Sequence, residues 1–208
     1  MRPMHRSRVA FIIFLGGCLL LSACARPRVR YPKPGQTEEG IASYYDGEFV
    51  GRRTANGEIM DRDQLTAAHR TYVFGTVLRV TNLDNGLDTV VRINDRGPFV
   101  HGRIIDLTLA GARALDMIGS GIAKVRLEVL AAPPPGTPMW VQIGAFIDPD
   151  NAERLRRRCS DASFPVTVIV EGEFHKVRLG PCESERDARI LAGRARKLDV
   201  PAIIVVEK

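Results

Sequence analysis

The residues best suited to chemistry surround one tight turn in the middle of the chain. Val90 to Ile93 is an apolar run that predicts a strand, and Asn94-Asp-Arg-Gly-Pro98 directly after it predicts a turn. Asp95 is therefore expected at a strand end, where a rigid element holds it. Carboxylates and imidazoles carry out general acid–base catalysis, and further groups of this kind precede the turn. They are Glu58, Asp61 and His69.

The same turn can also be interpreted as a salt-bridged surface loop. Three arginines lie close to it in the sequence, namely Arg92, Arg96 and Arg103. Asp106, which closes the apolar run Ile104-Ile105, is as suited to fixing one of these arginines as to catalysis. The carboxylates and the histidine upstream favour a reactive site over the purely structural interpretation.

The N-terminus of the 208-residue chain is typical of an exported protein. Residues 1–23 combine a basic start, the apolar run Val9 to Leu21 and small residues at the end, which predicts a signal peptide rather than a membrane span. The formal charge of +6 includes Arg2, Arg6 and Arg8, so removing the signal leaves +6 − 3 = +3. This charge, with no basic stretch interleaved with aromatics, argues against nucleic acid as a partner.

Leu21-Ser-Ala-Cys24 resembles the bacterial lipobox. The resemblance implies that Cys24 becomes the lipid-modified N-terminus and anchors the protein in a membrane. Ala25 in the next position implies sorting to the periplasmic face of the outer membrane. The alternative is an ordinary signal peptide with a chance cysteine.

Residues 24–37 are Pro-rich and basic, which predicts a flexible linker. Residues 38–131 then read as short strands separated by turns, and Asp84-Asn-Gly86 between two apolar runs predicts a hairpin. One helix is expected over residues 110–118, with Ala114, Leu115 and Ile118 buried. Many short strands with a single helix predict a small closed barrel.

Four prolines within residues 133–138 interrupt the pattern, and residues 132–137 are expected to be a stiff spacer. Residues 138–208 follow a β-α-β-β-α-β order, with Asp148-Pro149 and Ser184 at the two helix starts. This order predicts a ferredoxin-like domain with two helices on one face of a sheet.

Alternation along the strands of this second domain predicts which side chains face the helices. Val141, Ile143 and Ala145 are expected to face them on the first strand. The opposite face would then carry an indole, an amide and two cations that suit a sugar, although an ordinary polar surface is the alternative. These residues are Trp140, Gln142, Lys176 and Arg178.

The topology also brings the end of the first helix and the end of the third strand to the same edge of the sheet. Cys159 and Cys182 lie at these ends, so a disulfide between them is predicted in a compartment that permits it. His69, His101 and His175 share no ligand spacing, and no metal or cofactor is expected.

Taken together, the motifs resemble the rare lipoprotein A family of septal-ring lytic transglycosylases. They are the lipobox, Ala42-Ser-Tyr-Tyr45, Gly51-Arg-Arg-Thr-Ala-Asn-Gly-Glu58, Leu65-Thr-Ala-Ala-His69, Asn94-Asp-Arg-Gly-Pro-Phe99 and Ile105-Asp-Leu107. Val141-Gln-Ile-Gly-Ala-Phe146 and Val177-Arg-Leu-Gly-Pro181 are similar to the sporulation-related (SPOR) repeat. The resemblance implies a double-psi β-barrel over residues 38–131 and a SPOR domain over residues 138–208.

The resemblance also implies an activity. Members of the family cut the MurNAc–GlcNAc bond of peptide-free peptidoglycan strands without water and leave 1,6-anhydro ends, at the division septum and with divisome proteins as possible partners. Asp95 and Glu58 match the catalytic pair, with Asp95 as the leading acid/base and the reverse assignment as the alternative. Asp61 and His69 match further functional positions, which are expected to orient the pair by hydrogen bonds. Arg96 is expected to bind substrate.

Three other functions compete with this one. A barrel of this type can grip glycan without cutting it, as expansin-like relatives do. A hydrolase that uses water needs the same two carboxylates. A purely structural envelope lipoprotein would leave the group of Glu58, His69 and Asp95 unexplained.

Overall fold

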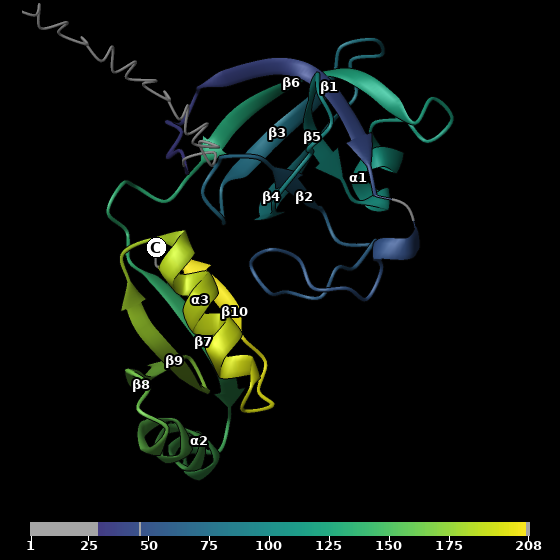
Figure 1. Cartoon of the computed structure of the whole chain (residues 1–208). Coiled ribbons are helices and arrows are strands. Elements are labelled where there is room, and N and C mark those ends of the chain that lie inside the picture. The colour runs from purple at the N-terminus through teal and green to yellow at the C-terminus, as the bar shows by residue number, and fades with distance from the viewer. Residues whose placement is uncertain (1–28, 46, 207–208) are drawn as a thin grey trace, which may run out of the picture.

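The computed structural model describes residues 29–45 and 47–206, which form two folded units (Figure 1). The predicted signal peptide and Cys24 lie outside these residues. None of the helices within them has the length and apolar character needed to cross a bilayer.

The first unit is a closed barrel of six strands in the order β1-β5-β2-β4-β3-β6. β1 pairs with β5 and β2 pairs with β4 in parallel, while the other neighbours are antiparallel. This confirms the predicted double-psi β-barrel. The strands are β1 (Thr37–Tyr44), β2 (Thr66–His69), β3 (Val77–Asn82), β4 (Asp88–Asp95), β5 (Arg103–Leu107) and β6 (Ile122–Ala131), and a short 3-10 helix spans Gly47–Phe49.

Alternating apolar residues fill the barrel. Leu78 and Val80 of β3 and Val91 of β4 are buried, whereas their neighbours along each strand are more exposed. The predicted hairpin joins β3 and β4, and Gly86 adopts the positive φ of 76° that such a turn requires. The strand that ends in Asp95 is therefore anchored in the core.

The barrel helix is shorter than predicted. α1 spans Leu109–Ala114, and Asp116 then adopts a φ of 51°, which turns the chain out of the helix. As a result Leu115 is buried as expected, but Ala114 and Ile118 are exposed and Met117 takes the buried position. The prediction of buried Ala114 and Ile118 was wrong because it extended the helical period through this turn.

The part of the predicted linker that the structure describes lies against the barrel. Arg30 forms a β-bridge with Tyr72, and its guanidinium lies 5.5 Å from the centre of the Tyr72 ring. The Gly35 N–H donates to Val129 O at 2.8 Å. Residues 29–36 therefore belong to the folded unit rather than to a free tether.

The second unit is a four-stranded sheet in the order β10-β7-β9-β8, with both helices packed on it (Figure 1). Asp148 and Ser184 cap the two helices by accepting from the N–H groups of Asp150 and Asp187. The predicted βαββαβ order is confirmed. Its elements are β7 (Met139–Phe146), α2 (Pro149–Asp161), β8 (Val166–Glu171), β9 (Phe174–Cys182), α3 (Glu185–Arg196) and β10 (Ile203–Val206).

A bulge changes the alternation along β7. Val141 and Ile143 are buried as predicted, but the register with β9 shifts between Gln142 and Gly144, and Ala145 is exposed. A Cβ on Gly144 would lie 2.6 Å from the Phe146 ring and 3.0 Å from Leu155 of α2, so Gly144 faces the helices instead. The prediction for Ala145 was wrong because alternation alone does not reveal a bulge.

The predicted disulfide is also absent, and both Cys159 and Cys182 are free thiols. Cys159 lies in the last turn of α2, where its carbonyl accepts from the Phe164 N–H at 3.0 Å. Cys182 lies beside Met139 of β7, next to residues of α3. The two thiols therefore belong to different helix–sheet contacts, and burial raises the pKa of each.

Candidate active site

Asp95 is the last residue of β4, and three donors hold its carboxylate. Oδ1 accepts from the N–H groups of Ala55 at 2.8 Å and Arg96 at 2.7 Å. Among the residues that the structure describes, Oδ2 accepts only from the Tyr45 hydroxyl, at 3.0 Å. One oxygen is thus fixed by the backbone, and the other keeps room for a further partner.

Tyr45 contacts the candidate catalytic carboxylate, although its sequence pattern alone did not mark it as a site residue. Burial, the charge of Asp95 and the hydrogen bond to it raise the pKa of Tyr45, so its hydroxyl stays protonated at neutral pH. Tyr45 therefore acts as a donor to Asp95 rather than as a base. Its place in the Ala42–Tyr45 motif, directly after β1, was the only signal for it.

Glu58 is held as a carboxylate on the loop between β1 and β2. Both of its oxygens accept from the Arg92 guanidinium, at 2.9 and 3.0 Å, and one also accepts from Asn94 Nδ2 at 2.7 Å. Burial alone would raise the pKa of Glu58, but the hydrogen bonds and the charge of Arg92 outweigh it, and the pKa is lowered. Glu58 is therefore ionised at neutral pH.

Three hydrogen bonds fix the loop that carries Glu58 to the last two residues of β4. Ala55 donates to the Asp95 side chain, Asn56 donates to the Asn94 carbonyl at 3.1 Å, and the Asn94 side chain donates to Glu58. Asp95 thus ends β4, and Glu58 is hydrogen-bonded to the preceding residue of the same strand, Asn94. Arg92, two residues earlier on the same strand, completes this support.

His69, at the end of β2, is only 3 % exposed and serves the local turn. Its Nδ1 accepts from the N–H groups of Thr71 and Tyr72, at 3.2 and 2.9 Å, and its ring stacks on Tyr72. Nε2 lies 3.7 Å from Glu38. Burial lowers the pKa of His69 despite the opposing effect of Glu38, which favours the neutral ring.

The remaining predicted acidic residues, Asp61 and Asp106, make local contacts of their own. Asp61 accepts from the Asp63 N–H at 2.9 Å in an exposed turn. Among the described residues, no hydrogen bond joins the side chain of Asp61 or His69 to Glu58 or Asp95. Asp106 accepts from the Ser43 hydroxyl and lies 3.8 Å from Arg103, as its structural interpretation predicts.

Arg96 joins the two units. Its guanidinium forms a two-pronged ion pair with Glu185, the first residue of α3, and both side chains are nearly buried. The guanidinium also lies 3.9 Å from the centre of the Phe74 ring and donates to the His69 carbonyl at 3.1 Å. These contacts make Arg96 a link between the domains, and not the free substrate-binding group that its sequence position predicted.

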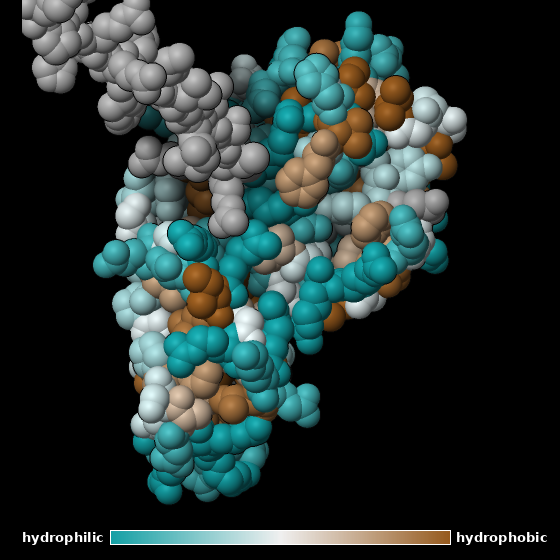
Figure 2. Space-filling model, viewed as in Figure 1, coloured by the Kyte–Doolittle hydropathy of each residue, from teal (hydrophilic) through white to brown (hydrophobic). Residues whose placement is uncertain are grey.

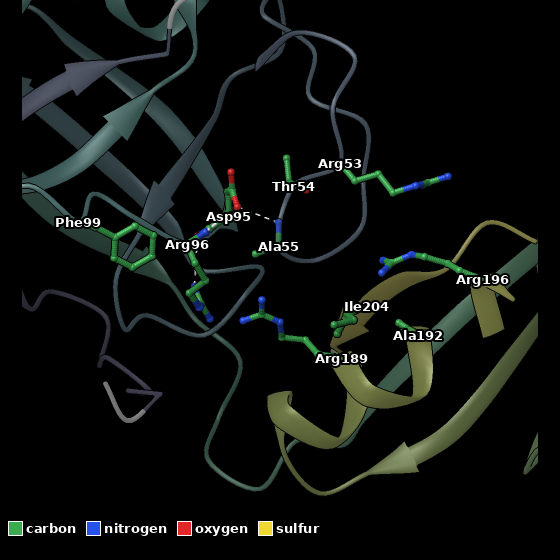
Figure 3. A pocket seen from close by; sticks show the side chains of 10 residues that line it. All are labelled: Arg53, Thr54, Ala55, Asp95, Arg96, Phe99, Arg189, Ala192, Arg196 and Ile204. Carbon is green, nitrogen blue, oxygen red and sulfur yellow. Dashed lines mark hydrogen bonds between the residues drawn. The ribbon is translucent and has the colours of Figure 1, made fainter. Parts of the chain in front are cut away.

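A cleft of about 540 Å³ opens between the barrel and α3, beside Asp95 (Figure 3). This volume lies within the range of about 300–1,000 Å³ found for small-molecule sites. Hydrophilic residues surround the junction of the two units on the face seen in Figure 2. The lining residues are Arg53, Thr54, Ala55, Asp95, Arg96, Phe99, Arg189, Ala192, Arg196 and Ile204.

The residues predicted to bind sugar on the second unit lie away from this cleft. Trp140 and Gln142 are half-buried on β7, and Gln142 is opposite Arg178 on β9. Lys176 and Arg178 both approach Glu171, at 2.7 and 3.5 Å. The structure thus brings these four residues together on one sheet, separate from Asp95.

No group of three or more His, Cys, Asp or Glu residues that could hold a metal ion occurs in residues 29–45 and 47–206. The site consists of carboxylates, a tyrosine and arginines. Such a set can donate and accept protons and bind anions.

Each of the two units matches a known family model. Residues 37–127 match the lytic transglycolase family model, and residues 135–205 match the SPOR domain. The chain is 54 % identical over 189 residues to the endolytic peptidoglycan transglycosylase RlpA of Campylobacter jejuni, an alignment that covers 76 % of this chain and 68 % of that protein.

A second relative, the endolytic peptidoglycan transglycosylase RlpA of Vibrio cholerae, is 49 % identical over 164 residues, with 74 % of this chain and 62 % of that protein covered. The chain thus spans about two thirds of the length of these relatives. Among solved structures, the RlpA SPOR domain from Pseudomonas aeruginosa is 29 % identical, covers 33 % of this chain and 99 % of that one, and has a TM-score of 0.30.

Proposed function

The chain belongs to the RlpA family of endolytic peptidoglycan transglycosylases, and from this premise we propose that it cleaves the MurNAc–GlcNAc bond of peptidoglycan without water, leaving 1,6-anhydro ends. The observation that carries the proposal is the Asp95 carboxylate at the cleft, with one oxygen fixed by two N–H groups and the other accepting from the Tyr45 hydroxyl.

Asp95 is the proposed general acid and base. Its protonated Oδ2 donates the proton to the leaving glycosidic oxygen as the C1–O bond breaks. The resulting carboxylate then takes the proton of the C6 hydroxyl, whose oxygen bonds to C1 and closes the anhydro ring. One carboxyl group serves both steps, so no water is consumed.

Glu58 is the proposed partner carboxylate, acting in its ionised form. Its lowered pKa makes it a poor proton donor at neutral pH, which supports Asp95 over Glu58 as the acid. Its negative charge near the end of β4 can stabilise positive charge that develops on the sugar ring. Asp61 and His69 are proposed to hold the surrounding turns, consistent with their hydrogen bonds to backbone N–H groups.

Phe99 gives the cleft an apolar surface for a sugar. Its ring lines the cleft beside Asp95 and is 79 % exposed, so its face is open to a ligand. Aromatic rings offer a broad apolar face to a ligand at low conformational cost. We propose that one sugar packs on Phe99 while the scissile bond lies at Asp95.

The SPOR domain is proposed to bind peptide-free glycan through the sheet that carries Trp140, Gln142, Lys176 and Arg178, and to enrich the protein at the septum, where divisome proteins are possible partners. Cys24 is proposed to carry the lipid that anchors it to the periplasmic face of the outer membrane. Labelling with radioactive palmitate tests the anchor, since a Cys24→Ser variant should lose the label.

Product analysis tests the reaction. We expect peptide-stripped glycan strands incubated with the purified protein to yield 1,6-anhydro ends by mass spectrometry. Reducing ends would indicate a hydrolase, and intact strands that stay bound to the protein would indicate the non-catalytic binding protein that is the second candidate.

The Asp95→Asn variant tests the assignment of the acid. Loss of general acid–base catalysis lowers turnover by roughly 10²–10⁴-fold. The amide can still accept from Ala55 and Arg96, so the fold should persist, and thermal unfolding serves as the check. Anhydro products at the wild-type rate would contradict the role of Asp95.

A further inference from the structure

The cleft beside Asp95 contains three arginines that the proposed reaction leaves without a role. Arg53 comes from the barrel loop that also carries Glu58, and Arg189 and Arg196 come from α3 of the second unit. Arg189 and Arg196 are seven residues apart, two turns along one face of the helix. Figure 3 shows both side chains extending from α3 toward the barrel.

These arginines lack strong anionic partners. Among the described residues, neither Arg53 nor Arg196 forms an ion pair, and each donates only to a backbone carbonyl, Gly57 O at 3.1 Å and Ala202 O at 3.0 Å. Arg189 lies 4.0 Å from Glu185, whose carboxylate already pairs with Arg96. The cleft therefore holds three cations that the protein leaves largely uncompensated.

All three arginines line the same cleft, and their like charges repel one another. The pKa of Arg196 is lowered, first by burial and then by the charges of Arg53 and Arg189. Arg196 Nε is also buried without a hydrogen-bond partner. Like charges brought together in a partly buried cleft destabilise the free protein, and an anion bound among them relieves that cost.

We propose that Arg53, Arg189 and Arg196 form a carboxylate-binding subsite, built jointly by the two domains, that recognises the free lactyl carboxylate of MurNAc. Arginine suits this task because its planar guanidinium binds a carboxylate through two parallel hydrogen bonds. The cleft also adjoins Asp95, so a MurNAc whose glycosidic bond lies at Asp95 has its own lactyl group within the same cavity.

The subsite rests on the proposed function and gives it a physical basis for selecting peptide-free strands. In strands that carry peptides, the lactyl carboxyl is an amide and bears no charge. Removal of the peptide exposes a carboxylate on each MurNAc. The carboxylates of the peptide itself are a second source of the same chemistry, but they lie further along the chain from the sugar ring.

The test compares two substrates that differ only in this charge: peptide-stripped strands, and the same strands with their lactyl carboxylates converted to methylamides. We expect the wild-type protein to prefer the charged strands by about tenfold in kcat/KM, as for hydrogen bonds to a charged group. The Arg189→Gln/Arg196→Gln variant should lose this preference, and high salt should reduce it in the wild type.

The matched control is Arg194→Gln. Arg194 lies on the same helix, but its guanidinium lies 4.9 Å from the centre of the Phe164 ring and outside the cleft, so the preference should stay at the wild-type value. Arg189→Gln alone is a second variant. The Arg189 side chain is 53 % exposed, so its replacement should leave the fold intact. This single change should weaken the preference severalfold.

Calorimetric binding of the two strands separates this inference from the proposed reaction. Equal affinity of the wild type for both, or a preference that survives in the double variant, would overturn the subsite. Tighter binding of intact, peptide-bearing strands would assign the arginines to peptide carboxylates and would also overturn it. Preferential binding without anhydro products would refute the reaction but support the subsite.

Discussion

At the scale of single residues, the site is defined by which oxygen of Asp95 stays available. The two backbone N–H groups hold Oδ1, and within residues 29–45 and 47–206 Tyr45 is the one donor to Oδ2. Tyr45 acts through Asp95 and is therefore a positioning residue. Its removal should lower the rate of the chemical step more than it weakens substrate binding.

Tyr45→Phe is therefore expected to lower kcat by about 10–100-fold, the loss of one hydrogen bond to a charged group, with little change in KM. Steady-state kinetics on peptide-stripped strands measures both. Tyr44→Phe is the control, since the Tyr44 hydroxyl donates only weakly, to Ile118 O at 3.4 Å. Equal losses in the two variants would show that Tyr45 has no specific role.

The ion pair of Glu58 with Arg92 makes the stability of the protein depend on pH. Its pKa in the folded protein lies below the ordinary value of 4.5, so its ion pair stabilises the fold above that pH and is lost as pH falls through the folded-state pKa. Glu58→Gln should lower the free energy of unfolding at pH 7 by about 1–3 kcal/mol, because Arg92 loses its ionic partner. The difference from the wild type should shrink below pH 4.5.

Urea unfolding at pH 7 and pH 3 measures this difference. Glu173→Gln, in the exposed turn between β8 and β9, serves as the control and should follow the wild type at both pH values. A Glu58→Gln deficit of the same size at pH 3 and pH 7 would argue that the carboxylate charge is not what stabilises the loop.

At the scale of elements, periodicity and turn chemistry predicted most strands and both helix caps of the second unit. The failures occur where the backbone leaves its regular period. The turn at Asp116 shortens α1, and the bulge in β7 reverses the faces of Gly144 and Ala145. Neither feature has a strong local signal, because tertiary packing selects it.

The candidate site was also predictable only in part, because local sequence patterns mark some of its residues and not others. Asp95 and Glu58 lie on turns with clear sequence signals, and the structure attaches both to the end of β4. Tyr45, Arg189 and Arg196 come from distant segments. The closed barrel brings Tyr45 to Asp95, and the docked helix brings the two arginines to the cleft. Pairings across the fold are not encoded in local patterns.

Glycines test how tightly the elements pack. A Cβ on Gly40 of β1 would lie 2.7 Å from Ile104 Cγ2, and Ile104 is buried and branched next to its backbone. Gly40→Ala should therefore lower the free energy of unfolding by about 1–3 kcal/mol through overpacking. Gly193 of α3 has open space around it, and Gly193→Ala should stabilise the protein by about 0.5–1 kcal/mol. Urea unfolding would contradict this packing argument if Gly40→Ala were neutral.

At the scale of the whole molecule, the two domains are docked through the loop that carries the site. The Ile204 N–H of β10 donates to Asn56 O at 2.6 Å, and Arg96 pairs with Glu185 of α3. The same contacts hold Arg189 and Arg196 beside Asp95. The cleft is therefore complete only while the two domains are docked. A change that separates the domains should also open the cleft.

Gly57→Ala tests this coupling, because Gly57 adopts a φ of 100° and an added Cβ would overlap the Ala202 carbonyl and lie 2.8 Å from Arg196 Nη2. We expect the second unit to swing away, with a larger radius of gyration by X-ray scattering and faster proteolysis of residues 132–138. Gly51→Ala is the matched control, since Gly51 has a φ of 79° in the same loop but meets nothing within 4 Å. Both variants carry similar backbone strain, so only contact with the second unit distinguishes them. Equal compactness of the two variants would mean that the docking does not depend on this contact.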